Sequence, residues 1–324
     1  MPAVLRRLLV LAWIAGLASL AQAADPYPTK SVRVVVTFPP GGSSDAMIRL
    51  LSPRLSDKLG QQIVVDNKPG AGGNIGLTQV AKAPADGYTL GVGAAGGLTA
   101  NPSLYPQMPY DALKDFQPVT LLAAIPFVIV GSPALPAKSL SHVIALARSQ
   151  PGKLTMAHGG NGTAMHLSTA LFEQMADIKL TQVPYKGSGP AALDVLSGQV
   201  QLALVDLPAS LQHIRSGKLV AYAVTSPQRL PMLPDVPTVS EAALPGYDST
   251  GWFGLVAPAG TPAYIVSRLN AEFGAALRDE HIQTTMRNMG MEPLPGTAEA
   301  FDAYMRSETV KWARVIRNAS IKLD

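Results

Sequence analysis

The sequence predicts an α/β protein built as two domains. Short apolar segments rich in β-branched residues alternate with segments whose apolar residues recur at helical spacing, and loops rich in Gly and Pro separate them. This alternation favours parallel strands, because a parallel crossover needs a long connection that is usually a helix. A length of 324 residues also suits two domains of about 150 residues each. A single large α/β domain is the alternative.

The first set of elements opens with a β-branched strand at residues 32–37. Ser43, Ser44 and Asp45 then precede a run of apolar residues at helical spacing, and Gly60 follows that run. Ser and Asp favour the start of a helix and Gly favours its end, so we expect a helix between them. The set continues with a strand at 62–65, a helix at 75–82 and a strand at 88–92.

Two long apolar segments, 119–130 and 252–257, are bounded by Pro and Gly and are predicted to be strands that cross between the domains. They enclose a second set of elements. That set comprises strands at 153–157, 182–185, 201–205 and 219–225 and helices at 164–175 and 190–197, and helices at 262–278 and 297–318 end the chain. We expect residues 24–123 and 252–324 to form the first domain and residues 124–251 the second. The two crossing strands would then act as a hinge.

The first 23 residues have the features of a secretory signal peptide. Arg6 and Arg7 precede a 13-residue apolar stretch, and Ala21-Gln22-Ala23 forms an A-x-A cleavage site. Such a stretch is too short to span a bilayer, although an N-terminal membrane anchor is the alternative. Cleavage after Ala23 removes both arginines and lowers the net charge from +4 to +2, so there is no electrostatic reason to expect a nucleic-acid partner.

Composition and motifs exclude several kinds of chemistry. The chain has no cysteine, which excludes disulfides, thiol catalysis and cysteine-ligated zinc or iron–sulfur clusters. It has neither a G-x-x-x-x-G-K-[ST] phosphate loop nor a G-x-S-x-G nucleophile motif, and its five histidines are not spaced as helical metal ligands. We therefore expect no catalytic residues, no metal and no cofactor.

One G-x-G-x-x-G pattern occurs at Gly91, Gly93 and Gly96, directly after a predicted strand. A dinucleotide site would need a helix to open at this loop, but Pro102 leaves room for only a short one. We expect instead that these glycines let the backbone approach a ligand or the other domain closely.

Two Gly-rich loops carry the main functional signal. Residues 38–45 (FPPGGSSD) and 158–163 (HGGNGT) each connect a predicted strand to a helix, one loop in each domain. A helix N-terminus carries about half a positive charge and free N–H groups, so two such ends facing across a cleft can hold a carboxylate. The alternative is that Ser43, Ser44 and Thr163 only cap their own helices. We assign Asp45 to capping and loop shape, because its charge would repel an anion.

Three further side chains have two possible roles each. His166, in the first turn of its helix, is either a packed or exposed side chain or a donor to the ligand. Lys186 either meets a second ligand carboxylate or is solvated. Asp206 either receives an amine or hydroxyl group or caps the turn before Pro208.

An ordered set of short motifs extends from Tyr27 to the C-terminal part of the chain. They are residues 27–30 (YPTK), 38–45 (FPPGGSSD), 65–73 (VDNKPGAGG), 86–90 (DGYTL), 101–105 (NPSLY), 114–116 (KDF), 184–187 (PYKG), 233–238 (LPDVPT) and 257–262 (APAGTP). Together these motifs make the chain similar to the extracytoplasmic solute receptors of tripartite tricarboxylate transporters, also called the Bug family.

The resemblance implies a type II periplasmic-binding-protein fold, with two doubly wound domains joined by a two-strand hinge. It also implies a monomeric periplasmic receptor that captures a small organic di- or tricarboxylate, or a related solute, and delivers it to membrane permease subunits. The implied ligand-binding positions are Phe38, Gly41, Gly42, Ser43, Ala94, Gly162, Thr163, His166, Lys186 and Asp206. Two positions depart from the family pattern: His158 stands where many relatives carry a small Ser, and Val205 replaces a bulkier residue before Asp206.

Three classes of function are compatible with the sequence: solute binding for transport or for signalling through a sensor, an exported α/β enzyme, and an exported structural or adhesive protein. The sequence has no nucleophile–base or metal constellation, which disfavours the enzyme. A structural protein would not require the two Gly-rich loops. We therefore expect a solute receptor.

Overall fold

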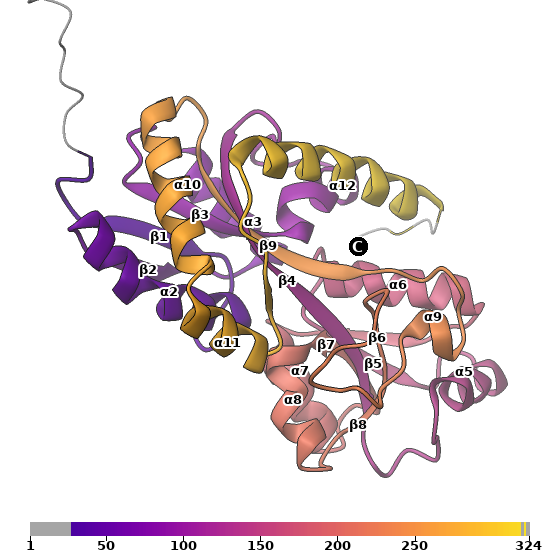
Figure 1. Ribbon diagram of the computed structural model, residues 1–324. Coiled ribbons are helices and arrows are strands. Elements are labelled where there is room, and N and C mark those ends of the chain that lie inside the picture. Colours follow the sequence, from indigo (N-terminus) through magenta and orange to yellow (C-terminus); the bar gives the residue numbers. More distant parts are fainter. Residues whose placement is uncertain (1–26, 319–320, 322–324) are drawn as a thin grey trace, which may run out of the picture.

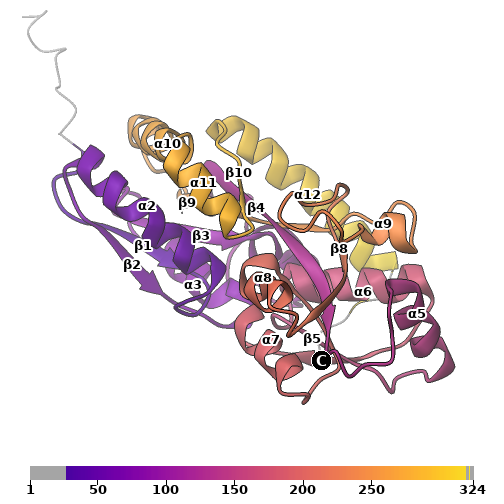
Figure 2. The same ribbon diagram turned by 60° about the horizontal axis from the view of Figure 1, so that its bottom comes forward.

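The computed structural model describes residues 27–318 and residue 321, so the expected signal peptide lies outside the described residues. The chain forms two lobes, each a β-sheet with helices on both faces (Figure 1; Figure 2). In the first lobe α2 and α10 pack on one face of the sheet and α3 and α12 on the other. In the second lobe α5 and α6 lie on one face and α7 and α8 on the other.

The sheet of the first lobe has the strand order β2-β1-β3-β9-β4-β10. Its parallel part consists of β1 (Val32–Val36), β2 (Ile63–Asn67) and β3 (Thr89–Ala94), which confirms the predicted strand–helix alternation. The sheet also contains antiparallel strands that the alternation did not predict, because β9 (Thr250–Pro258) runs antiparallel to both β3 and β4, and β10 (Glu292–Pro293) antiparallel to β4. The sheet is mixed because the chain leaves the lobe along β4 and returns along β9.

The sheet of the second lobe has the order β6-β5-β7-β4-β8. β5 (Thr155–His158), β6 (Thr181–Pro184) and β7 (Leu202–Asp206) are parallel. β4 is antiparallel to β7 and to β8 (Val220–Val224). The strands that bear functional loops therefore end at one common edge of this sheet, where ligands of α/β proteins bind.

β4 (Phe116–Gly131) belongs to both sheets. Its register with β9 ends at Pro126 opposite Thr250, and its register with β7 begins at Phe127 opposite Asp206. The chain crosses back just before β9, where the Ser249 N–H donates to the Thr225 carbonyl. The two crossing strands are thus those the sequence predicts. Along β4 and β9 the strand partner changes within three residues of the expected domain boundaries at 123/124 and 251/252. The domain boundaries themselves stay predictions.

The long helices begin and end close to the residues predicted from the sequence. Four further helices, α5, α8, α9 and α11, were not predicted. The helices are α2 (Ser43–Leu59), α3 (Asn74–Ala81), α4 (Asn101–Leu104), α5 (Leu140–Ser149), α6 (Ala164–Ala176), α7 (Ser188–Leu196), α8 (Leu207–Arg215), α9 (Val239–Ala242), α10 (Ala263–Leu277), α11 (Glu280–Asn288) and α12 (Ala298–Asn318). A 3-10 turn, η1 (Ala71–Gly73), precedes α3, and a π-helical segment, η2 (Gly96–Ala100), precedes α4. α8 is instructive, because its Pro208 lies in the first turn, where the missing N–H costs no helical hydrogen bond.

The C-terminal helix α12 connects the two lobes a third time. It starts on the sheet of the first lobe, where Phe301 packs on Trp252, and runs toward α6 of the second lobe (Figure 1). There Trp312 and Ile316 pack with Leu167 of α6. The helix was expected to belong to the first domain only, and this contact was not predicted.

None of the helices in residues 27–318 combines the length and the hydropathy needed to cross a membrane.

Candidate ligand-binding cavity

A cavity of about 690 Å³ lies between the lobes, at the ends of β1, β3, β5, β6 and β7. Both lobes contribute to its lining. Of the ten positions expected to bind ligand, eight line it: Phe38, Gly41, Gly42, Ser43, Ala94, Thr163, Lys186 and Asp206. Gly162 and His166 do not line it.

The N-terminus of α2 opens directly onto the cavity. Its N-cap residue is Gly42, which has no side chain to accept a hydrogen bond. Neither Ser43 nor Ser44 caps the helix with its hydroxyl. Instead, the Ser43 Oγ donates to Asp206 Oδ2 across the cleft at 2.5 Å. The Ser44 Oγ is buried, with the residue 1% exposed, and has no hydrogen-bond partner among the described residues. The capping interpretation is therefore wrong for α2, and its first N–H groups are free for a ligand.

Asp45 shapes the loop rather than lining the cavity. Its Oδ2 accepts the Gly41 N–H at 2.9 Å, and the Arg49 Nε donates to the same carboxylate. Burial alone would raise the pKa of the Asp45 carboxyl, but the hydrogen bonds from Arg49 and Gly41 outweigh it and lower that pKa. The expected role in loop shape is confirmed. The carboxylate holds Gly41 in its left-handed conformation, φ 79°, which glycine adopts without strain.

In the second lobe, the capping interpretation holds for α6. The Thr163 Oγ1 accepts the His166 N–H at 3.3 Å and donates to the Gly160 carbonyl at 2.7 Å. Thr163 still lines the cavity together with Ala164 and Met165, the first two residues of the helix. The α6 N-terminus therefore faces the cavity as expected.

Gly162, within that loop, and His166, in the first turn of α6, are not among the residues that line the cavity, so their expected contact with the ligand stays a prediction. Gly162 approaches the first lobe so closely that a Cβ built on Gly96 would overlap the Gly162 carbonyl oxygen. The G-x-G-x-x-G pattern is thereby explained: Gly96 lets the two lobes meet backbone to backbone, as the close-approach interpretation predicts.

His166 supports the loop from inside the second lobe. Its ring stacks on His158 with 5.0 Å between centroids. Each Nδ1 accepts a loop N–H, that of Gly160 at His158 and that of Gly162 at His166. Burial and the neighbouring His166 lower the pKa of His158 to about 3, and burial lowers that of His166. Both rings are neutral at neutral pH, so they can accept these N–H groups.

Two more helix N-termini, which the sequence analysis did not identify as part of the site, reach the same cavity. Gly187 precedes α7, whose Ser188 lines the cavity, and Asp206 is the N-cap of α8. The Asp206 Oδ1 accepts the Ala209 N–H at 3.3 Å, so Asp206 caps α8 as suggested, and its Oδ2 accepts the Ser43 hydroxyl. Its suggested contact with an amine or hydroxyl of the ligand stays a prediction. The Gly187-Ser188 step and the Asp206-x-Pro208 pattern were the available sequence signals. Burial raises the pKa of the Asp206 carboxyl.

Four helix N-termini thus converge on one cavity, which makes it a place for negative charge without a cluster of cationic side chains. Lys186 lines the cavity but is exposed. No group of His, Asp and Glu within the described residues is arranged to hold a metal ion.

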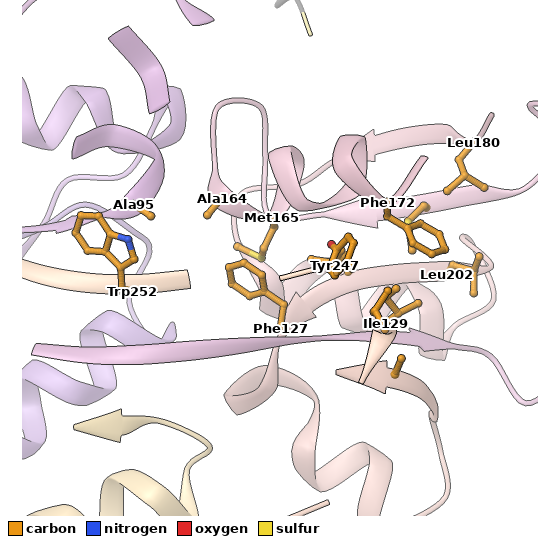
Figure 3. Packing of buried hydrophobic residues seen from close by; sticks show 14 of the residues in the cluster. Ala95, Phe127, Ile129, Ala164, Met165, Phe172, Leu180, Leu202, Tyr247 and Trp252 are labelled. Carbon is orange, nitrogen blue, oxygen red and sulfur yellow. The ribbon is translucent and has the colours of Figure 1, made fainter. Parts of the chain in front are cut away.

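Most of the remaining lining is apolar, with Gln212, His213 and Asn288 as polar exceptions. Figure 3 shows Trp252 and Ala95 on one side, and Ala164, Met165 and Phe127 on the other. Met289, at the end of the unpredicted helix α11, completes the lining from the C-terminal part of the chain. No sequence pattern predicted that these residues, which come from distant parts of the chain, would line one cavity.

Residues 47–321 match the family model described as "Tripartite tricarboxylate transporter family receptor". The chain belongs to this receptor family. The resemblance stated from the motifs is confirmed, and with it the α/β periplasmic-binding-protein fold and the function of a solute receptor for a tripartite transporter.

Relatives match over almost the whole chain. A protein of Pseudomonas sp. strain P51, named for the tcbD-tcbE intergenic region, is 40% identical over 91% of this chain and 88% of its own. BugT of Bordetella pertussis is 39% identical over 93% of this chain and 92% of its own.

Two solved structures of relatives have the same fold over almost the whole chain. Rpa4515 of R. palustris, a structure with adipate, is 38% identical, has a TM-score of 0.88 and covers 91% of this chain and 99% of its own. MatC of Rhodopseudomonas palustris with bound malate is 35% identical, with a TM-score of 0.85 and coverage of 90% and 100%.

Proposed function

We propose that this receptor acts in the periplasm, binds a small organic carboxylate in the cavity between its lobes and presents it to the permease subunits of a tripartite transporter. The ligand carboxylate lies at the N-terminus of α2, within reach of the N–H groups of Ser43 and Ser44 and of the Ser44 hydroxyl. The second-lobe loop that ends at Thr163 closes over it.

The observation that carries this proposal is the Ser44 Oγ. A buried hydroxyl without a partner costs about 1–3 kcal/mol, so it is retained where a ligand completes its hydrogen bonding. Its place in the first turn of a helix adds the partial positive charge of that helix. The adipate and malate carried by the two solved relatives are both carboxylates, which supports the same ligand class for this chain.

We further propose that the chain binds its ligand without converting it. Within the described lining of the cavity, no histidine or lysine hydrogen-bonds to a serine hydroxyl. The one carboxyl group that accepts from a lining serine, that of Asp206, also accepts the Ala209 N–H as the cap of α8, which suits a structural contact between the lobes. The two strands that cross between the lobes, β4 and β9, can act as a hinge, which suits a protein that captures and releases a ligand.

The test is titration calorimetry of the secreted protein, residues 24–324, against a panel of organic acids, with an assay for loss of each acid over time. We expect saturable binding of at least one carboxylate, no consumption of it, and a loss of affinity of about tenfold in Ser44→Ala, as for one hydrogen bond to a charged group. Ser197→Ala, an exposed serine on α7's C-terminal side, is the matched control. Conversion of a bound acid, or undiminished affinity in Ser44→Ala, contradicts the proposal.

A further inference from the structure

The interior of the cavity has almost no fixed charge. Of the described residues that line it, the ionisable ones are Lys186, Asp206 and His213. Lys186 is exposed, so it lies at the solvent side of the cavity, whereas Asp206 is 7% exposed and lies inside. The buried part therefore contains a carboxyl group and no lysine or arginine.

Large apolar side chains form the walls. Trp252 of the first lobe lies opposite Phe127 and Met165 of the second (Figure 3). The indole N–H of Trp252 already donates to Glu308, so the ring offers only its apolar surface to the cavity. Ile125 and Phe253 extend the same surface along the crossing strands.

The cavity is also large for a short diacid. Its volume of about 690 Å³ lies well within the range of about 300–1,000 Å³ typical of pockets that hold drug-sized ligands. A four-carbon diacid would leave most of this space to water in contact with apolar walls. A ring or a longer chain would remove that apolar surface from water, at about 25 cal/mol for each Å².

We propose that the ligand is a monocarboxylate with an apolar body, an aryl or alkyl acid, rather than a short di- or tricarboxylate. The inference rests on the proposed function and narrows its ligand class. The single carboxylate lies at the α2 N-terminus beside Ser44, and the apolar body lies between Trp252 and the Phe127–Met165 wall.

Charge balance is the physical reason. One carboxylate is matched by the α2 N-terminus, which has no side-chain cap, whereas Thr163 already caps α6 and the Asp206 carboxyl already caps α8. A second carboxylate on a short ligand would be buried against apolar walls or beside Asp206, without a cation to pair with it. Asp206 thus acts as a specificity residue that disfavours a second negative charge.

Hexanoate and adipate form the decisive pair, because they have the same six-carbon chain and differ by one carboxylate. Titration calorimetry of the residues 24–324 protein should give an affinity for hexanoate or 3-phenylpropanoate at least about tenfold higher than for adipate or malate. Asp206→Asn keeps an oxygen acceptor for Ser43 and removes the charge, so we expect the ratio of adipate to hexanoate affinity to rise by about tenfold. Asp177→Asn, an exposed position outside the cavity, should leave that ratio unchanged.

The outcomes separate the two proposals. Tighter binding of adipate or malate than of either monocarboxylate overturns this inference and leaves the proposed function intact. An unchanged ratio in Asp206→Asn overturns the role of Asp206. No binding of any of the four acids overturns the proposed function and this inference with it.

Discussion

The Ser43 hydroxyl donates to the Asp206 carboxylate at 2.5 Å, although 163 positions separate them and they belong to different lobes. Ser43 begins α2 and Asp206 caps α8, so the bond joins the N-termini of two helices across the ligand cavity. It lies where a ligand carboxylate would compete for the same donors. The closure of the cleft and the chemistry of its interior are therefore coupled through one hydrogen bond.

Ser43→Ala should destabilise the contact between the lobes. It leaves the buried Asp206 carboxylate with one donor fewer, which costs about 1–3 kcal/mol. Urea unfolding followed by circular dichroism measures the change. Ser197→Ala, an exposed serine, should change the free energy of unfolding by less than about 0.5 kcal/mol. Equal effects of the two variants would mean that the interlobe bond contributes nothing in solution.

The stability of the protein should fall as the pH drops below about 6.5. The pKa of His158 is lowered in the folded protein to about 3, whereas an unfolded histidine titrates near 6.5. Between these values the unfolded chain binds the proton and the folded chain does not, so the free energy of unfolding decreases by up to about 1.4 kcal/mol for each pH unit. Above pH 6.5 this contribution is fully present.

Denaturant titrations at pH 7, 6 and 5 measure this slope. His158→Asn removes the buried titrating ring and should flatten the slope in that window. His281→Asn, at an exposed position of α11, should leave it unchanged. A slope that survives in His158→Asn would assign the effect to other groups.

Gly96→Ala tests the backbone contact between the lobes. Within η2 an alanine is intrinsically better than glycine by about 1 kcal/mol, so local propensity predicts a gain in stability. The added Cβ would overlap the Gly162 carbonyl, however, so we expect the lobes to separate and ligand affinity to fall by about tenfold or more. Small-angle scattering and calorimetry report the two effects. Gly296→Ala has open space around it and is the control.

Trp312→Ala should show that α12 ties the lobes together. Trp312 is 1% exposed and packs with Leu104 and Leu167, which belong to different lobes. Loss of a buried Trp costs about 3–5 kcal/mol. Val310→Ala on the same helix removes a side chain that is 72% exposed and should have little effect. Thermal unfolding distinguishes these results, and similar melting temperatures for the two variants would rule out the tie.

The local patterns were sufficient for most of the elements. The β-branched run at 32–37 became β1, and the run of apolar residues at helical spacing that ends at Gly60 became α2, because each pattern is local and Gly60 ends the helix. α8 and α11 were missed because their apolar faces are short and are completed by neighbours. The mixed sheet was missed because strand direction depends on where β9 returns, which no local pattern encodes.

The site was partly predictable for the same reason. Phe38 to Ser43 could be placed at the cavity because a Gly-rich loop between a strand and a helix is recognisable in sequence. His166 could not be assigned, since its position relative to the loop depends on stacking with His158. Capping by Ser44 was left as an alternative, and only the folded chain shows that its hydroxyl has no partner among the described residues.

The sequence by itself determined the family, the two-lobed α/β architecture and the loops that we propose bind a carboxylate, because these depend on residues close together in the chain. Tertiary structure alone decided which helix ends meet, that Ser43 bonds to Asp206 rather than capping α2, and that the cavity wall is apolar. These features join residues more than a hundred positions apart. They are set by the packing of the lobes around β4 and β9, and no local pattern records that packing.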